Sequence, residues 1–332
     1  MIKTSFTTLM RIGALLALVA LAGCGGSSST VNPLSPTRVI AFGDSFSSVG
    51  VGNLFTVDTG EANTTVASRL ASIYGFTLTD VSGTPNTTLA SSGAFSYALG
   101  DNEVGAFNSA QYTSVATQIS SFLAKNAISS TDLIIITAGT QDIFNGANMS
   151  TATTTLANSI QSLTNAGAQY VVVMLPVDLA RTPWALNNKT ALERTALTNL
   201  TYDSSGTCNS YSCKLLTTLV TKYPATSSHQ PVLVADVMSY FNLITGTVST
   251  GNSNTFSANF GGANPDTAVC VVATTPNNCT SANTTAANHP IYGLAYTYAN
   301  SVFADSINLT PFANRLLADY IYNTIFYRAG WR

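Results

Sequence analysis

The chain has 332 residues, of which only 8% are charged, and its formal net charge is −2. This balance provides no basic surface for nucleic acid, so we expect no nucleic-acid partner. The length suits one large domain with a full hydrophobic core, and the abundance of serine, threonine and asparagine is typical of an exported globular protein.

The amino terminus predicts an export signal. Lys3 and Arg11 supply positive charge, and the apolar run over 12–22 has the length of a signal-peptide core but is too short to span a bilayer comfortably. The residues LAGC that end this run at Cys24 resemble a bacterial lipobox, in which the cysteine becomes the lipidated first residue. The alternative is a plain secretory peptide with an incidental cysteine.

The lipobox divides the chain into three parts. We expect a lipoprotein signal peptide at 1–23, a lipid-anchored flexible tether at 24–36 and a single domain at 37–332. The resemblance implies a location in the bacterial cell envelope, with Cys24 anchoring the protein at the outer membrane.

The remaining chain predicts alternating strands and helices. Strands are predicted at 39–42, 76–81, 133–137, 170–175 and 231–235. Helices are predicted at 62–74, 112–123, 153–165, 191–200, 215–222 and 310–326. The central strands are apolar without polar alternation, which is typical of a parallel sheet covered by helices on both faces. Right-handed crossovers then give a doubly wound α/β sandwich.

Four cysteines follow Cys24, and an even number in an oxidising compartment indicates disulfides. Three pairings are possible, and the short spacings favour Cys208–Cys213 and Cys270–Cys279. The second pair lies in a long polar stretch, 246–300, which we interpret as a stapled lid or rim near the active edge. We expect no metal site, because neither pair has Cys-x-x-Cys spacing and neither histidine lies in a ligand-like arrangement.

Candidate catalytic residues follow the predicted strands. Ser45 comes directly after the first strand, in the turn Gly43-Asp44-Ser45-Phe46, and therefore at the carboxyl edge of the sheet, where open α/β folds place their chemistry. A serine nucleophile also needs oxyanion donors and an oriented base. Gly93 could offer a backbone N–H, and Gln141 could offer a side-chain amide. Asp305 and Asn308 come just before the last helix.

These blocks together resemble the GDSL, or SGNH, hydrolase family. Residues 43–46 are similar to its first block, with Phe46 for the usual leucine; Gly93 is similar to the second-block glycine; residues 139–142 are similar to the third block; and residues 305–308 are similar to the final Asp-x-x-His block. The resemblance implies a flavodoxin-like three-layer α/β/α sandwich with a central parallel sheet of about five strands. It also implies ester hydrolysis without a cofactor.

The resemblance implies a role for each block. Ser45 would be the nucleophile, and its N–H, the N–H of Gly93 and the amide of Gln141 would form the oxyanion hole. Asp305 would orient the catalytic base, but the position of the base holds Asn308, and an amide cannot take a proton near neutral pH. Gln141 likewise replaces the usual asparagine.

Another histidine could substitute for the missing base. The chain has only His229 and His289. His229 precedes the strand predicted at 231–235 and so lies at the wrong edge of the sheet. His289 lies in the long polar stretch, which could fold over the active edge, and it is the candidate substitute base.

Two functions remain open. The first is a cell-envelope ester hydrolase with low activity, whose substrate is a small-molecule or polysaccharide ester. The second is a catalytically disabled relative that binds an acyl or glycan ligand. In either case we expect a monomer that meets the membrane through the lipid at Cys24.

Overall fold

The computed structural model describes residues 33–50, 65–100, 102–105, 114–203, 206–224, 230–246, 260–262, 264–270, 287–288 and 295–332. The predicted signal peptide and most of the tether lie outside these residues, as do Cys24, Cys279 and both histidines. Within the described part of the chain, no helix is long and apolar enough to cross a membrane.

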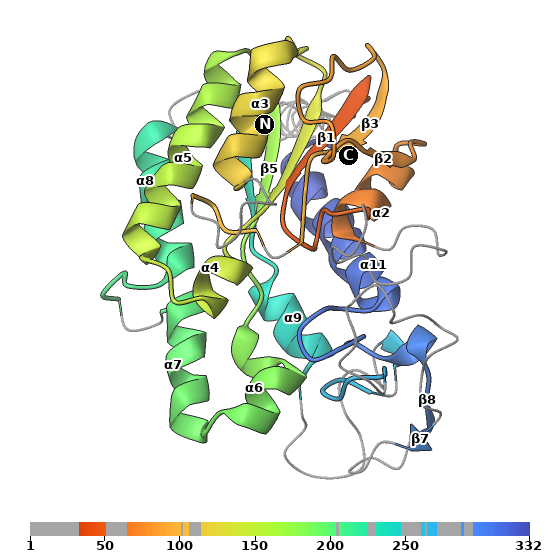
Figure 1. Cartoon of the computed structure of the whole chain (residues 1–332), viewed down its shortest axis with the longest axis vertical. Coiled ribbons are helices and arrows are strands. Elements are labelled where there is room, and N and C mark those ends of the chain that lie inside the picture. The colour runs from red at the N-terminus through yellow and green to blue at the C-terminus, as the bar shows by residue number, and fades with distance from the viewer. Residues whose placement is uncertain are drawn as a thin grey trace, which may run out of the picture.

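A six-stranded parallel sheet forms the centre of the protein (Figure 1), with the order β2-β3-β1-β4-β5-β6. The strands are β1 (Arg38–Gly43), β2 (Leu78–Asp80), β3 (Gly93–Ser96), β4 (Leu133–Thr137), β5 (Tyr170–Met174) and β6 (Val232–Ala235). The α/β class is therefore confirmed, with one strand more than the five that the sequence predicts.

Helices cover both faces of the sheet, which confirms the three-layer sandwich (Figure 1). One face carries α3 (Val115–Lys125), α5 (Met149–Asn165) and α8 (Tyr211–Lys222), and the other carries α2 (Val66–Ile73), α9 (Met238–Ile244) and α11 (Pro311–Tyr320). Alternate residues of β1 enter opposite cores, with Ile40 and Phe42 on the α3 side and Val39 and Ala41 on the α11 side. Burial on both faces explains why the central strands show no polar alternation.

The remaining described elements are short. They are the helices α4 (Thr140–Phe144), α6 (Pro183–Asn188) and α7 (Ala191–Thr201), the 3-10 turns η2 (Leu179–Arg181) and η5 (Tyr298–Asn300), and the strands β7 (Ala287–Asn288) and β8 (Ala295–Tyr296). A π-helical turn, η6 (Ile321–Phe326), continues α11. The sequence predicts α7 and the last helix but not α4, α6 or α9.

Strand β3 was not predicted, and its position corrects one site assignment. It pairs in parallel with β1 from Arg38↔Gly93 to Ala41↔Ser96. Gly93 therefore lies beside the first residue of β1, at the amino edge of the sheet. This segment has only one large apolar residue, Phe95, and its backbone is satisfied by β1 and β2 on either side.

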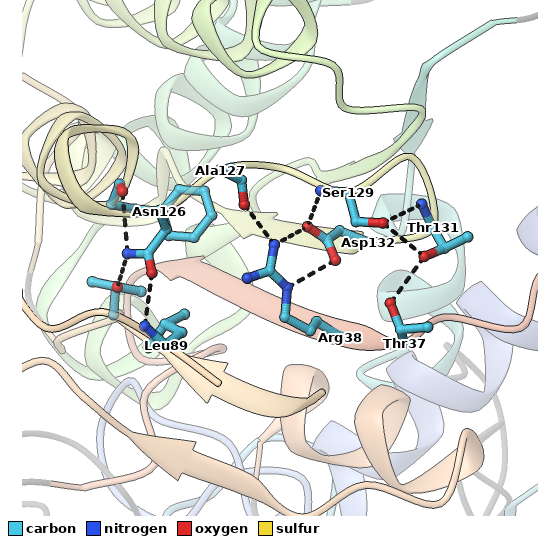
Figure 2. A network of polar contacts seen from close by, with 10 residues as sticks. Thr37, Arg38, Leu89, Asn126, Ala127, Ser129, Thr131 and Asp132 are labelled. Atoms are coloured by element: carbon cyan, nitrogen blue, oxygen red, sulfur yellow. Dashed lines mark hydrogen bonds and ion pairs between the residues drawn. The ribbon is translucent and has the colours of Figure 1, made fainter. Parts of the chain in front are cut away.

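A buried ion pair joins the start of β1 to the loop before β4 (Figure 2). The guanidinium of Arg38 donates to both carboxylate oxygens of Asp132 and to the carbonyl of Ala127. Asp132 also accepts the backbone N–H of Ser129 at 2.8 Å. The Asp132 side chain is fully buried, so this network holds two charges away from water at the amino edge of the sheet.

One of the two predicted disulfides lies within the described residues. Cys208 and Cys213 are bonded, which confirms the first pair and closes a short loop at the start of α8. Cys270 is also disulfide-bonded. Its predicted partner, Cys279, lies outside the described residues, so the second pairing stays a prediction.

Candidate active site

The turn that carries Ser45 begins where β1 ends. Gly43 has a φ of +135°, and a Cβ there would lie 2.0 Å from the carbonyl oxygen of Thr137 on β4, so only glycine fits. The N–H of Asp44 donates to that same carbonyl at 3.1 Å, and the carbonyl of Asp44 accepts the N–H groups of Ser47 and Ser48. Ser45 is thereby presented, partly exposed, at the carboxyl edge of the sheet.

Helix α3 holds this turn from one face. The side chain of Gln118 accepts the N–H of Gly43 at 2.8 Å and donates to the carbonyl of Gly43 at 3.1 Å. Gln118 is almost fully buried. Both backbone groups of the residue before Asp44 are therefore satisfied by a single side chain, which restricts how Ser45 can move.

The structure does not bring Gly93 to Ser45. Gly93 lies beside Arg38, about 16 Å along the strand from Gly43 at the usual rise per residue, so its N–H cannot reach an oxyanion at Ser45. The chain after β3 instead runs beside the end of β1, where the N–H of Leu99 donates to the carbonyl of Gly43 at 3.1 Å. Gly100, the next residue, is buried at this edge.

Sequence reasoning missed Gly100 because the strand before it was missed. The available signal is the apolar stretch 94–99, which ends in a glycine just as β1 ends in Gly43. A strand assigned there would have placed Gly100, rather than Gly93, at the carboxyl edge.

The loop after β4 provides Gln141. Gly139 has a φ of +107°, and a Cβ there would lie 2.5 Å from the ring of Tyr211, so glycine lets the chain turn closely against α8. Gln141 lies in the first turn of α4 and is partly exposed. Asp142 is buried and accepts the N–H of Val104 with both oxygens at 3.2 Å, which ties α4 to the segment after Gly100.

Asp305 and Asn308 form a tight turn before α11. One oxygen of Asp305 accepts the N–H groups of Ile307 and Asn308 at 2.8 and 2.7 Å. The other oxygen accepts the side-chain amide of Asn308 at 2.9 Å. Asp305 therefore holds the side chain of Asn308 in one orientation.

Contacts between loops place this turn at the same edge as Ser45. The carbonyl of Ser306 accepts the N–H of Trp184, whose ring centroid lies 4.8 Å from that of Phe144 at the end of α4. Ile307 packs against the core on the α3 side. The loops after β1, β3, β4 and β5 and the turn before α11 thus gather at one end of the sheet.

Asn308 does not provide a proton acceptor for Ser45, because its amide cannot take a proton near neutral pH. His229 and His289 both lie outside the described residues, so the role of His289 as substitute base stays a prediction. No group of three or more His, Cys, Asp or Glu side chains in the described ranges is arranged to hold a metal ion.

Two buried carboxyls lie beneath this edge. Burial raises the pKa of Asp44 from its ordinary value of 3.8 to about 6 and that of Asp142 to about 7. Oδ2 of Asp44 has no hydrogen-bond partner among the described residues, and neither has the buried hydroxyl of Tyr211. Burial, and then the nearby charges of Asp142 and Asp44, also raise the pKa of Tyr211.

These raised pKa values predict that the protein becomes less stable as the pH rises from acidic to neutral. A carboxyl whose pKa is higher in the folded state stabilises the fold below its unfolded pKa of about 4, and this contribution disappears as pH rises through 6 to 7. We expect the free energy of unfolding, measured by urea denaturation, to fall by more than about 1 kcal/mol between pH 5 and pH 8. Asp142→Asn should reduce this fall, and Asp236→Asn, at an exposed carboxyl, should leave it unchanged.

The model of the family described as GDSL-like lipase/acylhydrolase matches residues 39–321, and the chain therefore belongs to that family. This membership supports a hydrolase of the lipase and esterase type. Among solved structures, the crystal structure of a member of the lipolytic protein G-D-S-L family from Veillonella parvula DSM 2008 aligns with a TM-score of 0.45 and 13% sequence identity, over 86% of this chain and 97% of that chain. No curated protein matches the chain significantly.

Proposed function

We propose that the protein is a slow ester hydrolase of the bacterial cell envelope, with Ser45 as the nucleophile. The observation that carries this proposal is the hydrogen bond from the Asn308 amide to Asp305, at the edge where Ser45 is presented. Asp305 holds the side chain at 308 in the way that a triad carboxylate holds its base, but that side chain is an amide. A neutral amide leaves the Ser45 hydroxyl protonated, so turnover is low.

The oxyanion would be stabilised by three donors. Two are the backbone N–H groups of Ser45 and Gly100, and the third is the side-chain amide of Gln141. Gln141 keeps the amide of the usual asparagine but adds one methylene, which moves the donor by about 1 Å. Loss of such a donor altogether costs roughly 3–4 kcal/mol of transition-state stabilisation. The Gln141 amide keeps most of this stabilisation if it still donates a hydrogen bond to the oxyanion.

A disabled relative that only binds an acyl or glycan ligand is the second candidate. It is favoured by the same contact, because the Asn308 amide satisfies Asp305 without any titratable group. The two candidates differ in whether Ser45 supports turnover.

Replacing Ser45 with alanine separates them. We expect the wild type to hydrolyse p-nitrophenyl acetate slowly but measurably, and Ser45→Ala to reduce the rate to that of the buffer. Ser92→Ala, at an exposed serine at the far edge of the sheet, is the matched control and should keep the wild-type rate. A wild-type rate equal to that of Ser45→Ala would instead support the binding protein.

The envelope location is a separate part of the proposal. It rests on the apolar run over 12–22 and the lipobox-like residues that end in Cys24. Lipid attached to Cys24 would hold a monomeric domain near the outer membrane through the tether at 24–36, where it meets small-molecule or polysaccharide esters. Cys24→Ser should then move the protein from the membrane fraction to the soluble fraction.

A further inference from the structure

The loops that carry the proposed oxyanion donors are not all held in the same way. The N–H of Leu99, the residue before Gly100, donates to the carbonyl of Gly43 at 3.1 Å. Gly43 is in turn bound by the side chain of Gln118 on α3. Gly100 and the turn that carries Ser45 are therefore fixed relative to each other through β1 and α3.

The segment that follows Gly100 is also bound to α3. The carbonyls of Glu103 and Val104 accept the N–H groups of Val115 and Ala116 at 3.1 and 3.0 Å, at the start of that helix. Backbone hydrogen bonds therefore set the position of this segment independently of α4.

Gln141 lies in α4, which has little means of holding its own position. The helix has only 5 residues, far fewer than an isolated helix needs to be stable. Its N-cap residue is Gly139, which has no side chain to cap the first turn. The direction of the Gln141 amide therefore depends on contacts between α4 and its neighbours.

Among the described residues, side chains at two positions of α4 and its C-cap contact the segment after β3. Both oxygens of Asp142, the residue next to Gln141, accept the N–H of Val104 at 3.2 Å. The amide of Asn145, the C-cap residue, donates to Glu103 at 2.7 Å, but Asn145 is exposed. Asp142 is 1% exposed, so water does not compete for its hydrogen bond, and it is the stronger restraint on α4.

The surroundings of Asp142 are unfavourable for a carboxyl. Burial raises its pKa to about 7, and the negative charges of Glu103 and Asp44 contribute to this rise. The effect of Asp44 also places Asp142 near the turn that carries Ser45. None of the ion pairs in the described ranges includes Asp142. A buried acid beside two other acids lowers stability, and such groups cluster at functional sites.

We propose that Asp142 is a positioning residue of the oxyanion hole. By accepting the N–H of Val104, it holds α4 against the fixed segment after Gly100 and so directs the Gln141 amide toward the oxyanion that forms at Ser45. Asp142 itself does not touch the substrate. This inference rests on the proposed function for the presence of an oxyanion, whereas the effect of Asp142 on the position of Gln141 requires no turnover.

The position of Gln141 can be followed by NMR in full-length protein labelled with 15N-glutamine. Its side-chain amide resonance is assigned by its loss in Gln141→Ala. We expect Asp142→Ala to shift this resonance and to leave that of Gln161, on α5, unchanged. Asp178→Ala is the matched control, because Asp178 is also buried and also accepts a backbone N–H, from Ala180. It should shift neither resonance.

The consequence for catalysis is measured with p-nitrophenyl acetate. Asp142→Ala should lower kcat about 10-fold at unchanged KM, less than the 10²–10³-fold that complete loss of an oxyanion donor costs. Asp142→Asn keeps an oxygen that can accept the N–H of Val104, so it should retain most of the wild-type kcat. In a Gln141→Ala background, Asp142→Ala should change kcat less than about 2-fold, because its effect acts through the missing amide.

The outcomes separate this proposal from the proposed hydrolase. A Gln141 resonance that does not move in Asp142→Ala refutes the positioning role, whatever the activity. Equal losses of kcat from Asp142→Ala with and without Gln141 also refute it. If the resonance moves but hydrolysis does not depend on Ser45, the positioning of Gln141 stands and the hydrolase is refuted. Should Asp142→Ala not fold, Asp142→Ser, whose side chain is shorter than that of aspartate but still polar, replaces it with the same expected results.

Discussion

Replacing Asn308 with histidine should raise kcat for p-nitrophenyl acetate by about 10²-fold or more, because a general base contributes roughly 10²–10⁴-fold. Asp305 already accepts a hydrogen bond from the side chain at 308 at 2.9 Å. An imidazole there could donate one ring N–H to Asp305 and leave its other nitrogen to take the proton of Ser45. The rate should then acquire a pH dependence with a midpoint near 6.5, the ordinary pKa of histidine.

Two variants control this experiment. Asn308→Gln keeps an amide and should give no increase. The double variant with Ser45→Ala and Asn308→His should show only the background rate, since the new base would have no hydroxyl to activate. An Asn308→His variant that is no faster than the wild type would mean that the side chain at 308 does not reach Ser45.

If the wild-type enzyme hydrolyses the ester rapidly, His289 becomes the candidate proton acceptor for Ser45. If Ser45→Ala abolishes a high wild-type rate, another group must take the proton, and His289→Ala should then lower kcat strongly. If activity survives His289→Ala, the substitute-base hypothesis is wrong. His229→Ala serves as the matched histidine control, because the strand it precedes, β6, begins at the amino edge of the sheet.

Replacing Asp132 with alanine should lower the free energy of unfolding by about 3–5 kcal/mol, since it leaves the Arg38 guanidinium buried without its counter-charge. The two side chains are 8% and 0% exposed, and Asp132 also holds the N–H of Ser129. Chemical denaturation at pH 7 measures the effect. The pair lies at the amino edge of the sheet, so kcat of the folded variant should be unchanged.

The matched control is Asp319→Ala. Asp319 pairs with Arg69 at 2.8 Å, but both side chains are about one-third exposed, and such pairs contribute at most about 1 kcal/mol. If Asp132→Ala and Asp319→Ala lower the free energy of unfolding equally, burial does not make the Arg38–Asp132 pair more stabilising than an exposed pair. Replacing both Arg38 and Asp132 with apolar residues should recover much of the lost stability, because no charge is then left unpaired.

The fold was largely predictable because its central strands carry a strong local signal. Residues 133–137 and 170–174 are nearly all apolar, and their burial on both faces makes that composition necessary. Strand β3 carries no such signal, since its four residues are stabilised by pairing with β1 and β2 rather than by their own composition. Helices α4 and α9 were missed because they have only 5 and 7 residues, too few to show a helical period. Helix α6 did carry a local signal that was not used, since Thr182 caps it and Pro183 is its first residue.

The site divides in a similar way. Ser45, Asp305 and Asn308 could be placed from local sequence because each lies in a short turn next to a recognisable strand or helix. The glycine of the second block could not be placed in this way. Gly93 begins strand β3 and Gly100 follows its end, and the choice between them requires knowing that this strand exists.

The sequence by itself determined the α/β class, the position of the candidate nucleophile Ser45 and the absence of histidine at 308. These depend on residue type and local order, which need no folded partner. Only the tertiary structure decided that Gly100 rather than Gly93 lies at the edge of Ser45, and that Asp305 binds the amide of Asn308. Strand register and side-chain contacts are set by packing between distant segments, and no local pattern encodes them.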